Sequence, residues 1–253
     1  MNKKTILSAA AAVALLAGSA LASTPAAKPA VKKSATPEQV AANALPAASN
    51  VAPTGTPATA APGSVYAING FRTATFGMDE AEVRAAIARD LGVAADKIHT
   101  ETNPMQRTTA LTVQTALPPG PGEATVSYIF GAATHRLIHV NVVWATTATP
   151  TTADRGAIAA AGLQLANYFR TQPWDPKTPV RAGLVGNGAG LLMFDATDPK
   201  GGSVSVEADN IPLSQNVNGK TQSNDPKGAA VLHVSYAQDA AHPDVFAIKP
   251  GAF

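Results

Sequence analysis

Three consecutive segments of the chain alternate between apolar and polar residues with a period of two. They span residues 108–117, 123–130 and 136–145. Successive side chains of a strand point to opposite faces of a sheet, so Val140 and Val142 share an apolar face. This alternation is typical of an antiparallel sheet that buries one face against a core and leaves the other face exposed to solvent or only lightly covered.

A capping pattern predicts the start of an amphipathic helix over residues 79–91. Asp79 is the expected N-cap, and Glu82 stands three residues later, as in a capping box. Val83 and Ile87 then recur at a spacing of four, and Gly92 supplies a left-handed end.

A second helix is predicted over residues 152–171, capped by Thr151 or Thr152. Its period of 3.6 predicts a buried stripe. The residues of this stripe are Ile158, Ala161, Leu165, Tyr168 and Phe169.

The rest of the chain adds more strands and one long polar segment. Strands are expected at 65–68, 180–185, 190–196, 203–208 and 230–237, and an exposed loop at 210–228. The chain is therefore expected to be α+β, with two main helices packed on one face of antiparallel sheet. The order of elements suggests two α-β-β-β units in tandem, with halves 65–148 and 149–253.

Residues 1–22 have the order of a secretory signal peptide. Lys3 and Lys4 precede an apolar run that ends in Ala20-Leu21-Ala22. An uncleaved single-span anchor is the alternative. The chain has no cysteine, which excludes a lipid anchor at the mature N-terminus. The protein is predicted to be periplasmic or secreted.

Residues 23–64 are rich in alanine, proline and threonine and carry almost no large apolar side chain. Such a segment buries too little surface to offset its ordering entropy. A disordered linker is therefore predicted before a globular domain at 65–253.

The charge balance argues against a nucleic-acid partner. The chain has 19 Lys and Arg against 17 Asp and Glu, and 14 against 16 once the four charges of the linker and the two lysines of the signal peptide are removed. Binding to phosphate backbones requires a basic excess, which this domain lacks.

No catalytic or cofactor-binding motif is recognised, so no catalytic residue and no cofactor are predicted. His139 and His233 lie on the polar faces of their predicted strands and meet if those strands are neighbours. They are weak candidates for metal ligands. Solvated surface histidines are the favoured interpretation, since no third ligand is evident.

Two motifs carry a resemblance to known proteins. The helix start Phe76-Gly77-Met78-Asp79-Glu80-Ala81-Glu82-Val83, together with Ser235-Tyr236 through Pro243-Asp244-Val245-Phe246, resembles a family of uncharacterised proteobacterial exported proteins. More distantly, the helix start followed by antiparallel strands is similar to BamE-like envelope proteins and to the β-lactamase-inhibitor-protein fold. Those relatives are protein-binding modules, so the resemblance implies binding and no enzymatic activity.

The favoured function is a non-enzymatic, exported interaction module for an envelope protein or polymer. The first alternative is a cell-envelope hydrolase that uses carboxylates such as Asp195, Glu207 or Asp209. The second is a small-molecule or metal carrier built around His139 and His233. Function has to be argued from a site, and the sequence alone identifies none.

Overall fold

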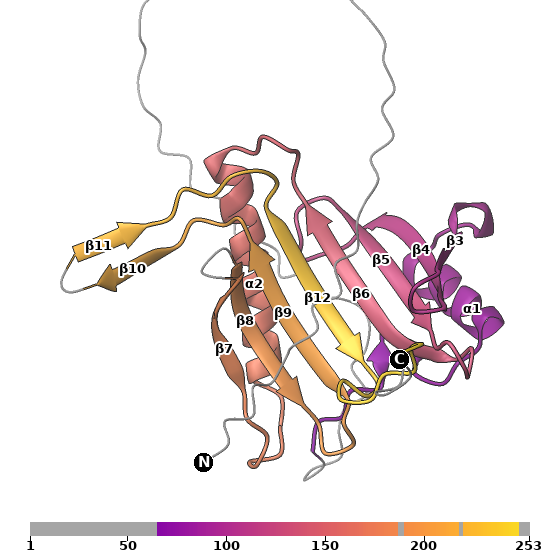
Figure 1. Ribbon diagram of the computed structural model, residues 1–253. Coiled ribbons are helices and arrows are strands. Elements are labelled where there is room, and N and C mark those ends of the chain that lie inside the picture. The colour runs from indigo at the N-terminus through magenta and orange to yellow at the C-terminus, as the bar shows by residue number, and fades with distance from the viewer. Residues whose placement is uncertain (1–64, 187–189, 218–219, 248–253) are drawn as a thin grey trace, which may run out of the picture. The chain divides into compact units, whose positions relative to one another are not determined.

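An eight-stranded antiparallel sheet organises the computed structural model, which describes residues 65–186, 190–217 and 220–247 (Figure 1). The predicted signal peptide and linker lie outside the described residues. In spatial order the strands are β3 (His99–Asn103), β4 (Thr108–Ala116), β5 (Glu123–Phe130), β6 (Leu137–Ala145), β12 (Val231–Ala237), β9 (Ser203–Asp209), β8 (Gly190–Thr197) and β7 (Arg181–Val185).

The remaining elements are two helices, one turn of 3₁₀ helix and two hairpins. They are α1 (Glu80–Leu91), α2 (Thr152–Arg170), η1 (Ala95–Lys97), the hairpin of β1 (Gly70–Phe71) with β2 (Ala74–Thr75), and the hairpin of β10 (Ser214–Val217) with β11 (Lys220–Ser223). No helix among the described residues combines the length and the apolar character needed to span a membrane.

The strand order is symmetric about the β6–β12 pair. Each half of the chain supplies a helix followed by four strands of the sheet, and the last strand of each half meets the other in an antiparallel pair. The tandem arrangement thus has a fourth strand per half, where three were expected. The fourth strands are the edge strands β3 and β7; β7 agrees with the strand expected at 180–185, whereas β3 was not among the expected strands.

Both helices begin as the capping patterns predict. Asp79 accepts a hydrogen bond from the Glu82 amide at 3.0 Å, and the Asp79 amide donates to the Glu82 carboxylate at 2.8 Å. Gly92 ends α1 in the left-handed region, with φ 64°. Thr151 caps α2 through a second capping box with Asp154. Each cap satisfies backbone donors that a helix start otherwise leaves unpaired.

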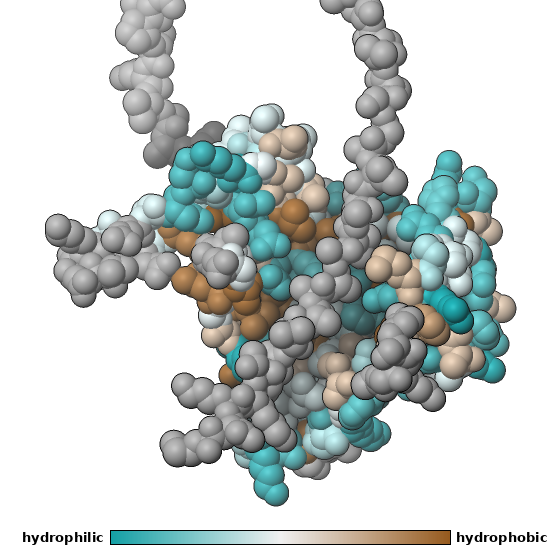
Figure 2. All heavy atoms as spheres, in the orientation of Figure 1, coloured by the Kyte–Doolittle hydropathy of each residue, from teal (hydrophilic) through white to brown (hydrophobic). Residues whose placement is uncertain are grey.

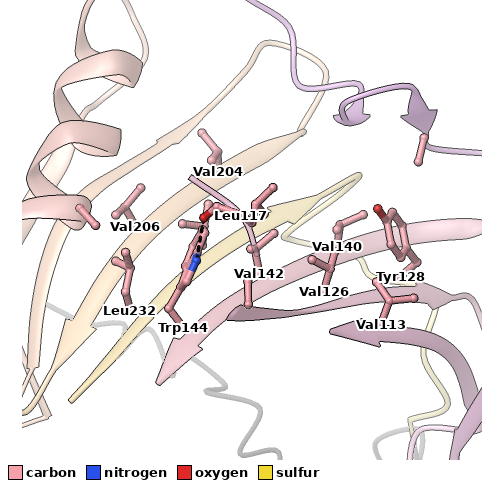
Figure 3. Packing of buried hydrophobic residues seen from close by; sticks show 14 of the residues in the cluster. Val113, Leu117, Val126, Tyr128, Val140, Val142, Trp144, Val204, Val206 and Leu232 are labelled. Carbon is pink, nitrogen blue, oxygen red and sulfur yellow. Dashed lines mark hydrogen bonds between the residues drawn. The ribbon is translucent and has the colours of Figure 1, made fainter. Parts of the chain in front are cut away.

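The two helices share one core on one face of the sheet. Val83 and Ile87 of α1 are fully buried, as are Ile158 and Phe169 of α2 apart from 1–2% of their surface. Figure 3 shows the strand side of this core, where aligned valines point the same way. Full burial of each such side chain stabilises the fold by roughly 1.5–3 kcal/mol. In a chain without disulfides, this core is the main source of stability.

Trp144 closes the core at the end of β6. Its indole Nε1–H donates to the Leu117 carbonyl at 3.0 Å (Figure 3). Gly120 packs closely against the indole, and a Cβ at this position would clash with the ring. A polar indole nitrogen is therefore buried with its hydrogen bond satisfied, as buried tryptophans require.

Three local predictions differ from the structure. Residues 210–228 contain the β10–β11 hairpin and are not a plain loop. Tyr168 is 41% exposed. Its neighbour Phe169 lies on the buried side of α2, and position 168 lies outside that side. Residues 65–68 form no strand, although Ile68 is buried.

Candidate binding face

The face of the large sheet opposite α1 and α2 is covered by no described helix or strand. We call it the open face. In Figure 1, α2 passes behind β8 and β9, so the view is onto this face. Burial alternates along the central strands, with core-side residues buried and open-face residues half-buried, most clearly in β9 and β5. This confirms the polar face expected from the period-two pattern.

Register aligns one row of polar residues across every strand of the open face. Neighbouring strands lie about 4.8 Å apart, so such a row forms a continuous polar band. From β3 to β7 the row consists of His99, Thr112, Ser127, Asn141, Ser235, Ser205, Asp195 and Arg181. We call it the polar row.

The centre of the polar row is a hydrogen-bonded cluster on β6 and β12. Nε2 of His139 lies 2.8 Å from Asn141 Oδ1 and 2.7 Å from Ser235 Oγ. Nε2 of His233 approaches the same Asn141 oxygen at 3.0 Å. Two imidazoles thus converge from opposite directions on the Asn141–Ser235 pair. The two histidines were expected to meet if their strands were neighbours, and the strands β6 and β12 are indeed paired.

Both imidazoles favour the neutral state. Burial lowers the pKa of His139, and a hydrogen bond with Asn141 only partly opposes the shift. Burial also lowers the pKa of His233, and the nearby His139 lowers it further. Desolvation penalises the charged form of a histidine. At neutral pH the middle of the open face therefore carries no positive charge from these residues.

The charged residues of the eight strands all project on the open face, and they are mainly acidic. Arg181 is the one lysine or arginine in these strands, and its Nε donates to Asp195 at 2.6 Å. Glu207 and Asp209 follow each other on this face of β9. Burial raises the pKa of both carboxyl groups, and the charge of Asp209 raises that of Glu207 further.

The hydrolase candidates do not form a catalytic arrangement among the described residues. Asp195 forms an ion pair with Arg181. Glu207 and Asp209 lie on the surface of β9. Ser235 and His139 form a nucleophile–base contact, but β12 is hydrogen-bonded on both sides. Its backbone amides are thus committed to the sheet and cannot form an oxyanion hole.

The described residues include no group of three or more His, Cys, Asp or Glu side chains that could hold a metal ion. His139 and His233 therefore remain a two-nitrogen pair, with Asn141 and Ser235 as weaker neighbours. A hollow of about 390 Å³ opens at the β3–β4 edge, lined partly by Lys97, His99 and Glu123. It is wide and open, unlike the enclosed pockets that bind small molecules.

Comparisons with known proteins add no further constraint. No protein-family model matches the chain, and neither a curated protein nor a solved structure matches it. The suspected relationship to exported proteobacterial proteins and BamE-like modules stays a prediction.

Proposed function

We propose that this protein is an exported, non-enzymatic binding module that holds a protein partner on the open face. The observation that carries the proposal is the polar row, which runs in register over eight strands and is covered by no described helix or strand. A pleated surface of this kind offers a large, nearly rigid area with few long side chains to order. Association then costs little side-chain entropy.

The shape of the face favours a macromolecule over a small ligand. Small-molecule sites are concave and enclose most of the ligand. Here the polar groups lie on a sheet surface, and the central ones already satisfy one another through Asn141. The face also lacks the aromatic platforms typical of stacking recognition, because its strands place their tyrosine and tryptophan side chains on the core side.

A position-specific cross-linking experiment tests the proposal. The native chain has no cysteine, so a single engineered thiol is the only site of attachment. Ser127→Cys and Ser205→Cys place a cross-linker on the open face, and Gln164→Cys places it on the exposed side of α2 as the matched control. We expect the same envelope protein to be captured from both open-face positions and not from position 164.

A second substitution separates specific docking from accidental capture. Ser127→Tyr adds bulk to the polar row without touching the core, so it is expected to abolish capture from position 205 while the unfolding midpoint stays unchanged. Equal capture from position 164, or capture that survives Ser127→Tyr, would refute the proposal.

A metal carrier is the second candidate, because two imidazole nitrogens converge on Asn141. Equilibrium dialysis of the full chain against zinc and copper tests it. Stoichiometric uptake that is lost in His139→Gln and in His233→Gln supports a carrier. Absence of uptake leaves the binding module as the function.

A further inference from the structure

The open face holds every carboxylate without a partner in the described part of the chain. Twelve of the sixteen described Asp and Glu side chains cap a helix or turn, or pair with Arg, Lys or His, as for Asp79, Asp198 and Asp244. The four with no hydrogen-bond or ion-pair partner among the described residues are Glu101, Glu123, Glu207 and Asp209. All four project on the open face.

Two of these four form a partly desolvated pair. Glu207 and Asp209 are half-buried, whereas Glu101 and Glu123 are exposed. Opposite Asp209 on β8 stands Gly190. A Cβ at that glycine would overlap Asp209 Oδ1 and lie 3.4 Å from Glu207 Oε1. The space that a side chain at position 190 would fill is therefore occupied by the Asp209 carboxylate and the Val185 side chain, with the Glu207 carboxylate beside them.

The cross-strand neighbours of this pair include two apolar side chains, and His233 on β12 stands opposite Glu207. Register places Leu192 beside Glu207 and Val231 beside Asp209, both half-buried on the open face. Figure 2 shows hydrophobic surface on the β7–β8 side of this view, next to hydrophilic surface. We call Glu207, Asp209, Leu192 and Val231 the acidic strip.

We propose that the partner docks a basic, partly apolar segment on the acidic strip, with an arginine or lysine side chain on the solvent side of Glu207 and Asp209 that contacts both carboxylates. This inference rests on the proposed function and names the chemistry of its partner. The support is charge complementarity: a half-desolvated carboxylate pair without a cation is costly when free and favourable when a cation approaches.

A separate partner suits the acidic strip better than the chain's own linker does. Residues 23–64 contain Lys28, Lys32 and Lys33, but they contain no aromatic residue and few large apolar residues. Such a segment supplies cations but only scattered valine and leucine side chains with which to cover Leu192 and Val231. Arginine suits the site because its planar guanidinium can bond two carboxylates and lie flat on apolar surface.

The test uses a fluorescent peptide of alternating leucine and arginine, with a leucine–glutamate peptide as the negative probe, and the full chain without residues 1–22. The double variant Glu207→Gln/Asp209→Asn removes the pair. The double variant Glu101→Gln/Glu123→Gln removes two charges from the same face, distant from the strip. We expect the first to weaken binding of the arginine peptide about tenfold at about 0.05 M salt, and the second less than about twofold.

Four outcomes would overturn the inference. Three are equal weakening by the two double variants, no binding of the arginine peptide, and binding that persists unchanged at about 0.5 M salt; the fourth concerns the linker. A triple variant Lys28→Gln/Lys32→Gln/Lys33→Gln that binds the peptide more tightly would assign the strip to the linker and contradict a partner. Cross-linking from Ser127→Cys and Ser205→Cys is scored separately. The proposed function therefore stands or falls independently of the peptide result.

Discussion

Replacing Asp198 is expected to destabilise the protein more than replacing any other carboxylate in the described part. This side chain is only 5% exposed and lies in the turn between β8 and β9. One carboxylate oxygen accepts from the amides of Lys200 at 2.8 Å and Gly202 at 2.9 Å. The other accepts from Ile68 at 2.8 Å, across 130 positions of sequence.

The magnitude follows from these three hydrogen bonds. Each bond to a charged group contributes about 1.5–3 kcal/mol, and a buried donor left unpaired costs a further 1–3 kcal/mol. Since water can reach part of the turn and the bonds are not additive, Asp198→Ala is expected to lower the free energy of unfolding by about 3–5 kcal/mol. Asp198→Asn retains one carbonyl oxygen but turns its side-chain NH2 group toward a backbone N–H donor. We therefore expect it to lower the free energy of unfolding by about 2 kcal/mol.

Urea unfolding followed by tryptophan fluorescence measures both effects. Asp225→Ala is the matched control, because Asp225 is exposed and its one ion pair within the described part of the chain is with the exposed Lys227, so no measurable change is expected there. A loss below 1 kcal/mol for Asp198→Ala would show that the turn does not depend on this carboxylate. The reasoning would also fail if Asp198→Asn were as damaging as Asp198→Ala.

Three further predictions use the same measurement. Gly120→Ala should lower stability by about 1–3 kcal/mol and change the near-ultraviolet dichroism of Trp144, since the methyl group must displace the indole; an unchanged spectrum would contradict the packing. Asp79→Ala should cost about 1 kcal/mol through loss of the α1 cap, and Asp79→Asn much less; equal losses would show that charge, and not capping, matters. The lowered pKa values of His139 and His233 favour the neutral folded state, so their contribution to stability is complete above pH 6.5 and falls as the pH drops through the folded pKa. His139→Gln/His233→Gln should therefore flatten the decline of stability below pH 6.5, and an unchanged slope would refute this assignment.

Local patterns in the sequence were sufficient to predict most of the individual elements. The bounds of β5 agree with the alternation at 123–130, and α1 begins and ends where Asp79 and Gly92 predict. Strand β3 lacks this signal, because the segment His-Thr-Glu-Thr-Asn has no apolar residue and all five side chains are exposed. An edge strand of this kind is specified by its pairing with β4, which a local pattern does not reveal.

The candidate site could be predicted only in part. The polar faces were evident, and so was the possibility that His139 and His233 meet. The polar row itself depends on which strands become neighbours, and Asn141 and Ser235 are brought opposite each other from separate halves of the chain. That Glu207 and Asp209 have no hydrogen-bond or ion-pair partner among the described residues is likewise visible only once the contacts of each described carboxylate are known in three dimensions.

The pairing of β6 with β12 has a consequence for the two fragments that cleavage between the halves of the chain would produce. This seam is the sole strand pairing between the two halves in the large sheet, and it joins seven residues of each strand. A cut in the exposed segment 147–149 leaves two fragments, each with its own helix and an unprotected final strand. We expect neither to be stable alone and the mixture to reassemble, since complementary edges are a template for pairing. His139 and His233 lie on opposite sides of that seam, so the His233–Asn141 and Ser235–His139 hydrogen bonds would re-form only in the reunited molecule.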